Sequence, residues 1–315
     1  MPNKPSTETI QAHAPEVGEL LTRLNRDPWA LRPEAFDRLL GTVLMVDREP
    51  PELQARLYEA GSLDMQAGKL DVPRSSGTVA VVPIVGVIDQ RRNYWGNVFT
   101  DELGPMLDSL VANESIGAIV LDVDSPGGSV SGVPELAEHI RGLRGTKPIY
   151  SISNPQMASA AYWLGTAADK TFVTPSGEVG SIGVWTMHIE LTKMLEEWGV
   201  KITGISAGKY KVEGNWWEPL GDEAKASMQA DVDAYYGMFL DAVAKNRGRR
   251  SSTVQREFGE GRMVMAEGTE DNPGAVKRGM ADGIATLPDL LGALVPKRRG
   301  TSVVSASLDI ALAED

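Results

Sequence analysis

Residues 118–144 read AIVLDVDSPGGSVSGVPELAEHIRGLR, and this stretch decides the fold class. Its first part, AIVLDVD, is short, apolar and β-branched, which predicts a strand buried on both faces. The part from Val133 onward predicts a helix, because Pro134 and two acids stand in its early turns, where a helix tolerates proline and favours negative charge. A buried strand joined to a helix by a short turn is the unit from which parallel sheets are built. We therefore expect an α/β fold.

Both flanks continue this alternation of strands and helices. Further buried strands are predicted at 78–88, 147–153 and 170–174. Helices are predicted at 101–113, 156–169, 187–199 and 221–248. The order of these elements implies crossover connections and a mainly parallel sheet.

Composition divides the 315 residues into three parts. Residues 1–76 form a leader and linker, whose last part, 69–77, is polar and places a domain boundary near Gly77. Residues 77–295 hold the α/β unit. Residues 296–315 are expected to form a flexible tail.

Composition and charge also exclude several classes of function. The net charge is −12, so we expect no nucleic-acid partner. The chain has no cysteine and three histidines, which leaves no thiolate site and argues against a metal site; we expect no metal and no cofactor. No targeting segment and no apolar stretch of membrane-spanning length is evident, so we expect a cytoplasmic protein without a membrane partner.

Two segments could carry catalytic chemistry. The loop DSPGGSVSG, residues 124–132, lies between a strand and a helix, where its glycines allow close approach of another group to free N–H donors. Ser159 lies in the first two turns of a predicted helix, among small alanines that leave its hydroxyl accessible. Taken singly, the loop is better explained as a tight turn, and Ser159 as a serine packed among alanines.

A nucleophilic serine needs a base, and the residues alone leave this choice open. His188 could serve in a Ser–His arrangement. Lys209 or Lys211 could serve if the surroundings lowered the pKa of the amine toward neutrality. A third glycine-rich segment, residues 177–185, contains Ser181, and the sequence alone favours a turn at the edge of a strand.

Four segments in order resemble the signal peptide peptidase A family of serine peptidases. They are LDVDSPGGSV, MASAAYWLGTAAD, GEVGSIGV and SAGKYK, within a resemblance that covers about residues 78–290. The resemblance implies the fold that the family shares with the Clp protease and the crotonases, a spiral of strand–strand–helix units, here with a small helical leader. It also implies a Ser–Lys dyad.

The resemblance assigns a role to each matching residue. Ser159 would be the nucleophile and Lys211 the general base, with Ser181 hydrogen-bonded to the lysine. The N–H groups of Gly128 and Ala160 would form the oxyanion hole. The family often has glycines after the nucleophile, where this chain has alanines, which keeps the N–H groups but narrows the space above them.

The segment RDPWALRPEAFDRLL, residues 26–40, resembles the leader of the family's phage branch, the head maturation proteases of the lambda protein C type. This implies a serine endopeptidase from a phage or prophage that cleaves capsid scaffold or portal-associated proteins, in the host cytoplasm or within the prohead. Three alternatives share the fold: a crotonase-like acyl-CoA enzyme, a catalytically silent capsid assembly protein, and a Ser–His–Asp peptidase that uses His188.

The leader also bears on assembly. Short amphipathic helices are predicted at 16–26, 33–46 and 51–66, with a turn at 27–33 that carries Trp29. Such helices gain most of their stability by packing an apolar face. We therefore expect them to dock on the main domain or on a second copy of the chain, and we expect a homo-oligomer.

Overall fold

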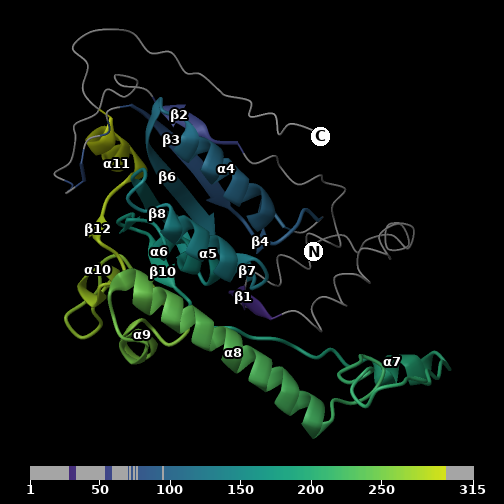
Figure 1. Cartoon of the computed structure of the whole chain (residues 1–315). Coiled ribbons are helices and arrows are strands. Elements are labelled where there is room, and N and C mark those ends of the chain that lie inside the picture. The colour runs from purple at the N-terminus through teal and green to yellow at the C-terminus, as the bar shows by residue number, and fades with distance from the viewer. Residues whose placement is uncertain are drawn as a thin grey trace, which may run out of the picture.

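The computed structural model describes residues 28–32, 54–58, 70, 72–73, 75, 77–93 and 96–295 (Figure 1). The helices predicted at 16–26 and 33–46 and the tail at 296–315 lie outside these residues. The described part is a mixed α/β structure with parallel strands and eight helices, which confirms the α/β fold class.

The larger sheet follows the order β11-β10-β8-β6-β3-β2. Its centre consists of three parallel strands, β3 (Thr78–Val85), β6 (Ile116–Ser125) and β8 (Ile149–Ala158). The short strand β10 (Glu178–Gly180) runs parallel to the end of β8. Off this path, β9 pairs with β8 and β12; the remaining strands are β2 (Arg56–Tyr58), β9 (Lys170–Val173), β11 (Met263–Met265) and β12 (Gly283–Ile284).

Both faces of this sheet are buried, as the unbroken apolar runs predict. In β3, alternate side chains point to opposite faces. Ala80, Val82 and Ile84 join a core formed with four helices, α4 (Thr100–Ala112), α5 (Val133–Gly142), α6 (Ala160–Thr166) and α8 (Asp222–Arg247). Val79 and Val81 pack on the other side with α11 (Leu287–Leu294). Figure 1 shows α4 and α5 across one face of the strands and α11 near one end of the sheet.

A smaller sheet has the order β1-β7-β4-β5 and holds the glycine-rich loop. Its strands are β1 (Trp29–Leu31), β4 (Ile88–Asp89), β5 (Val98–Phe99) and β7 (Gly127–Ser129). β1 pairs antiparallel with β7, and β4 pairs parallel with it.

Two predictions for the leader are wrong where the structure describes it. Residues 29–31, expected in a turn, form β1, and residues 56–58, expected in a helix, form β2. In both places, backbone pairing with a distant strand overrides local propensity, since β1 bonds to β7 and β2 to β3. The division into domains stays a prediction.

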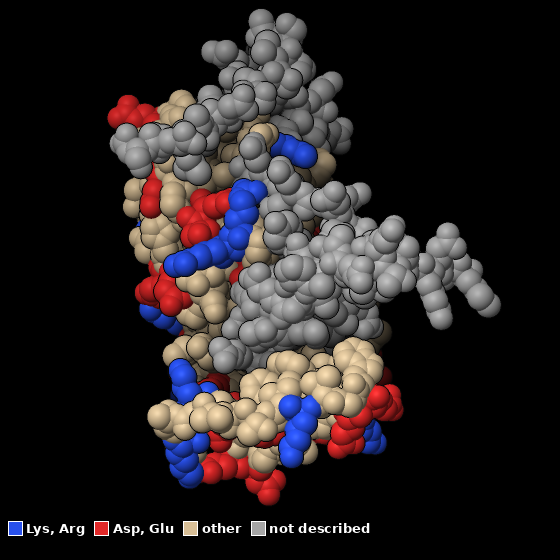
Figure 2. Space-filling model, turned by 90° about the vertical axis from the view of Figure 1, so that its right-hand side faces the viewer, with Lys and Arg blue, Asp and Glu red and all other residues tan. Residues whose placement is uncertain are grey.

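The segment between β10 and α8 extends away from the sheets. Its one described helix, α7 (Thr192–Glu197), is shorter than predicted; α9 (Ser251–Glu257) and α10 (Ala275–Arg278) follow α8. In Figure 1, α7 lies far from α6, beyond the N-terminal end of α8. Figure 2 looks onto this side, whose lower end is a mostly uncharged surface with acidic and basic side chains around its rim. None of the helices in the described part is both long and apolar enough to span a bilayer.

Candidate active site

Ser159 occupies the junction between β8 and α6. The helix predicted at 156–169 begins only at residue 160, because residues 156–158 pair as the end of β8, so Ser159 precedes the helix instead of lying in its first two turns. It is the N-cap of α6, with φ 54° and ψ −119°, and is 1% exposed. Its N–H donates to the Gly180 carbonyl at 2.7 Å, and its carbonyl accepts from the Trp163 N–H at 3.0 Å. A non-glycine residue with positive φ is held there by its surroundings at an energetic cost. The sharp turn therefore sets Ser159 at the N-terminal end of a buried helix.

The helix behind Ser159 is anchored through its aromatic side chains. The ring of Trp163 stacks on Phe239 of α8, with centroids 4.5 Å apart and an interplanar angle of 8°. The Tyr162 hydroxyl donates to the Met280 carbonyl at 2.8 Å, and burial raises the pKa of Tyr162. These contacts hold α6 rigid, which a preorganised nucleophile requires.

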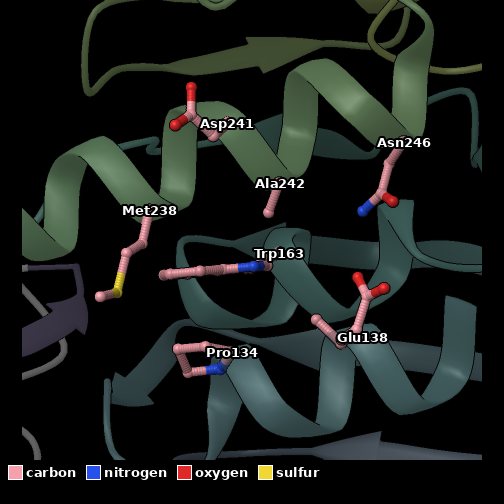
Figure 3. Close-up of a pocket in the computed structure, with 8 residues that line it drawn as sticks. Pro134, Glu138, Trp163, Met238, Asp241, Ala242 and Asn246 are labelled. Atoms are coloured by element: carbon pink, nitrogen blue, oxygen red, sulfur yellow. The ribbon is translucent and has the colours of Figure 1, made fainter.

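A small cavity of about 250 Å³ lies where α5, α6 and α8 meet (Figure 3). Trp163 forms its floor, and Pro134 and Met238 lie at one end. Glu138 at the other end accepts a hydrogen bond from Lys245 of α8 at 2.9 Å. Ser159 is absent from its lining, so we assign the cavity to helix packing rather than to the candidate active site.

The glycine-rich loop lies directly beside Ser159. A β-carbon built on Gly127 would lie 2.9 Å from the Ser159 Cβ, and one built on Gly128 would lie 1.8 Å from the Ile88 carbonyl oxygen. Gly127 also has φ 97°, so both positions require glycine. The sequence-predicted residues Gly128, Ser159 and Ala160, the first residue of α6, are thus brought together. The Ala160 N–H belongs to the first turn, where N–H groups lack a partner within the helix.

Ser125 supports this loop and was missed by sequence reasoning. Its buried hydroxyl donates to the Gly86 carbonyl at 2.6 Å and accepts from the Gly127 N–H at 3.2 Å. The only signal in the sequence was its place before the Pro-Gly-Gly turn.

Ser181 also lies at the site. The parallel register pairs Gly180 with Ala158, so the residues that follow them, Ser181 and Ser159, are neighbours across the strand ends. Ser181 shares the unusual backbone of Ser159, with φ 53°, and its N–H donates to the Arg262 carbonyl at 2.9 Å. The Ser159 Oγ itself approaches the Gly183 carbonyl at 3.5 Å, which makes a weak hydrogen bond.

The candidate bases lie away from Ser159 within one chain. Lys211 is exposed and lines a cleft with Ala224 and Met228 in the first two turns of α8. Phe239, which packs on α6, lies 11 residues beyond Met228 and 15 beyond Ala224, so at 1.5 Å per residue the two regions are roughly 16–22 Å apart along α8. A single chain therefore does not bring Lys211 to Ser159.

The other two candidate bases are engaged elsewhere. Lys209 pairs with Glu223 at 2.6 Å, and hydrogen bonds to Glu223 and Tyr210 raise the pKa of Lys209, which disfavours the neutral amine. His188 lies 2.7 Å from the Asn215 carbonyl through Nε2. Among the described residues there is no cluster of three or more His, Cys, Asp or Glu that could hold a metal ion.

Comparisons with known proteins bear on this geometry. Residues 142–294 match the model of peptidase family S49. The head-tail preconnector protein GP5 of Enterobacteria phage P21 is 35% identical over 174 residues, 54% of this chain and 35% of that protein. Capsid assembly protease C of Escherichia phage lambda is 33% identical over 174 residues, 54% of this chain and 40% of that protein. Protease 4 of Salmonella typhi is 26% identical over 216 residues, 68% of this chain and 34% of that protein. The chain thus spans well under half the length of these relatives.

Proposed function

Because residues 142–294 match the model of peptidase family S49, we propose that the chain is a serine endopeptidase whose nucleophile is Ser159. The observation that carries the proposal is the position of Ser159, at a strained helix N-terminus beside a loop where only glycine fits. The similarity to the phage proteins supports a role in the maturation of a phage or prophage head, with scaffold or portal-associated capsid proteins as substrates. The same similarity supports proteolysis inside the prohead. We also propose that the sheets and helices form the spiral shared with the Clp protease and the crotonases.

The chemistry follows from the groups around Ser159. A neutral amine accepts the proton of the hydroxyl while Oγ attacks the carbonyl carbon of a peptide bond. The N–H groups of Gly128 and Ala160 stabilise the oxyanion, and Ser181 orients the amine. The amine then protonates the leaving nitrogen, and water hydrolyses the acyl-enzyme.

We propose that the amine is Lys211 of a second copy of the chain. Two observations support this: Lys211 lies some 20 Å along α8 from the helix that carries Ser159, and the segment before it exposes apolar side chains. Trp198 is 67% exposed and Ile205 is 95% exposed. Exposed apolar surface of this kind is typical of an interface. A homo-oligomer would cover it and complete the site.

A fluorophosphonate probe tests the nucleophile and the oligomer. The wild-type chain should label at Ser159, and the Ser159→Ala and Lys211→Ala variants should not. Mixing the two inactive variants should restore labelling, since one copy then supplies the serine and another the lysine. Lys209→Ala is the matched control and should label like the wild type.

Two results would contradict this reading. If the wild-type chain is labelled while light scattering shows a monomer of 33.9 kDa, a second copy is not needed for the site. If the wild type is not labelled, Ser159 is not an activated nucleophile, and the proposed peptidase function is wrong. Mass spectrometry of capsid proteins co-expressed with wild-type or Ser159→Ala enzyme then identifies the substrates.

A further inference from the structure

The leader strand β1 lies between strand β7 and the bridge residue Trp185, beside the candidate active site. On one edge it pairs antiparallel with β7, with Trp29 opposite Ser129 and Leu31 opposite Gly127. On the other edge, the Trp29 N–H donates to the Trp185 carbonyl at 2.8 Å, and the Trp185 N–H donates back at 3.0 Å. A segment held by its backbone along a glycine-rich strand is bound in the way that sheets bind extended peptides. Figure 1 shows β1 against β7, near β10.

The carbonyl of Ala30 faces the candidate oxyanion donor. The Val130 N–H donates to the Pro28 carbonyl at 3.1 Å, and the Arg32 N–H donates to the Pro126 carbonyl at 3.0 Å. Hydrogen-bonded pairs alternate along an antiparallel ladder, so the pair between these two, Ala30 with Gly128, is also hydrogen-bonded. The Gly128 N–H that would hold an oxyanion therefore faces the Ala30 oxygen.

The same oxygen lies close to the nucleophile. The position where a β-carbon on Gly127 would sit is 2.1 Å from the Ala30 carbonyl oxygen and 2.9 Å from the Ser159 Cβ. The Ala30 carbonyl oxygen and the Ser159 Cβ therefore lie within about 5 Å of each other beside Gly127.

The chain is held on both sides of this carbonyl. Trp29, Ala30 and Leu31 are all buried. After the Ala30 carbonyl, the Trp185 Nε1 donates to the Leu31 carbonyl at 2.8 Å, and Arg32 pairs with Glu178 at 2.7 Å. Contacts on both sides of one peptide bond are what a protease needs to present that bond for cleavage.

We propose that residues 28–32 are an intramolecular substrate, which occupies the place of a bound peptide beside Ser159 and presents the Ala30–Leu31 peptide bond for cleavage. This rests on the proposed peptidase function and extends it to the regulation and specificity of the same site. The Ser159 Oγ attacks the Ala30 carbonyl carbon, the bond to the Leu31 nitrogen breaks, and that nitrogen takes the proton that the base removed from Ser159. Water then hydrolyses the ester, which leaves an Ala30 carboxylate.

The same geometry defines the class of external substrate. A protein that replaces residues 28–32 must be extended, because both edges of the strand are hydrogen-bonded. It must carry a small residue before the cleaved bond, because Ala30 is 0% exposed and joins the main core cluster. An apolar residue should follow, in the place of the buried Leu31.

The test uses the full chain, with fluorophosphonate labelling of Ser159 and intact mass as readouts. Ala30→Arg puts a long charged side chain at a buried position, so it should expel the leader, raise the labelling rate at least tenfold and abolish cleavage after residue 30. Because that variant could fail to fold, Arg32→Ala serves as the second. It removes the ion pair to Glu178 and should raise labelling about twofold to fivefold. Arg92→Ala, which removes the comparable pair to Glu102 at 2.9 Å, is the matched control and should label like the wild type.

Prolonged incubation of the wild type should yield a fragment that ends at Ala30, and Ser159→Ala should yield none. The Arg32→Ala enzyme should also cut the peptide RDPWALRPE, residues 26–34, between Ala30 and Leu31, but not the same peptide with arginine at position 30. Equal labelling of the wild type and both variants, with no cleavage at this bond, would overturn the intramolecular substrate and leave the peptidase intact. Absence of labelling in every variant would overturn both.

Discussion

The backbone strain at Ser159 predicts that glycine is more stabilising there than alanine, against the usual order of the two residues. Ser159 has φ 54° and ψ −119°, a region in which side chains cost roughly 1–3 kcal/mol. Alanine keeps this cost, whereas glycine escapes it and instead loses about 0.5–1 kcal/mol of backbone entropy. The hydroxyl contributes little in either variant, because its bond to the Gly183 carbonyl is 3.5 Å long.

We therefore expect Ser159→Gly to exceed Ser159→Ala in free energy of unfolding by about 1 kcal/mol. For a chain of 315 residues that corresponds to a difference of about 1–2 °C in Tm. Urea unfolding followed by circular dichroism measures the free energies, and both variants should be inert toward the fluorophosphonate probe.

Ser151 provides the matched control. It is a buried serine of β8 without a positive φ, and its hydroxyl donates to the Gly165 carbonyl at 2.8 Å. There, glycine should be less stable than alanine by about 0.5–1 kcal/mol. If glycine is also the less stable replacement at Ser159, and by a similar amount, the turn is not strained and the reasoning fails.

Three further predictions concern the surroundings of the site. Trp163→Ala should lower the free energy of unfolding by about 3–5 kcal/mol in urea titrations, because it removes the ring stacked on Phe239. The control Trp198→Ala, at an exposed position, should lower it by under about 1 kcal/mol. Burial raises the pKa of Asp122, so the folded state keeps its proton to higher pH than the unfolded chain, and stability falls as pH rises from about 4 through the raised pKa. The decrease in the urea midpoint between about pH 4 and about pH 7 should be smaller in Asp122→Asn than in the wild type, and an equal decrease in both would contradict this role of Asp122. His188→Ala should keep most fluorophosphonate labelling, and loss of labelling would instead favour a Ser–His mechanism.

The strands and helices of the main domain follow from the sequence. The β-branched run at 118–124 becomes β6, and the long pattern at 221–248 becomes α8. The run predicted as one strand at 78–88 is divided at Gly86 into β3 and the start of β4, which belong to different sheets. Each of these elements depends on side chains that are close together in the sequence, so the pattern that predicts it can be recognised without the tertiary structure. The candidate nucleophile Ser159 and the glycine-rich loop could be named for the same reason.

The backbone at the site could not be predicted in this way. The positive φ of Ser159 and Ser181 arises where β8 and β10 end side by side, and the approach of Gly127 to Ser159 joins two separate crossover units. Single-residue propensities do not predict these features. They disfavour serine at positive φ, and they contain no information about which distant residue lies beside it.

What the sequence alone determined about this protein is the α/β class, most of its elements and the residues able to do chemistry. Only the tertiary structure decided what lies against Ser159. It placed β1 on the glycine-rich loop, and it left Lys211 on an exposed segment beside the first turns of α8, away from α6. The reason is that β1 is held largely by backbone hydrogen bonds to residues about a hundred positions away, and every residue except proline carries the same backbone donor and acceptor. A turn and a strand therefore look alike in PWALR until its partner strands are in place.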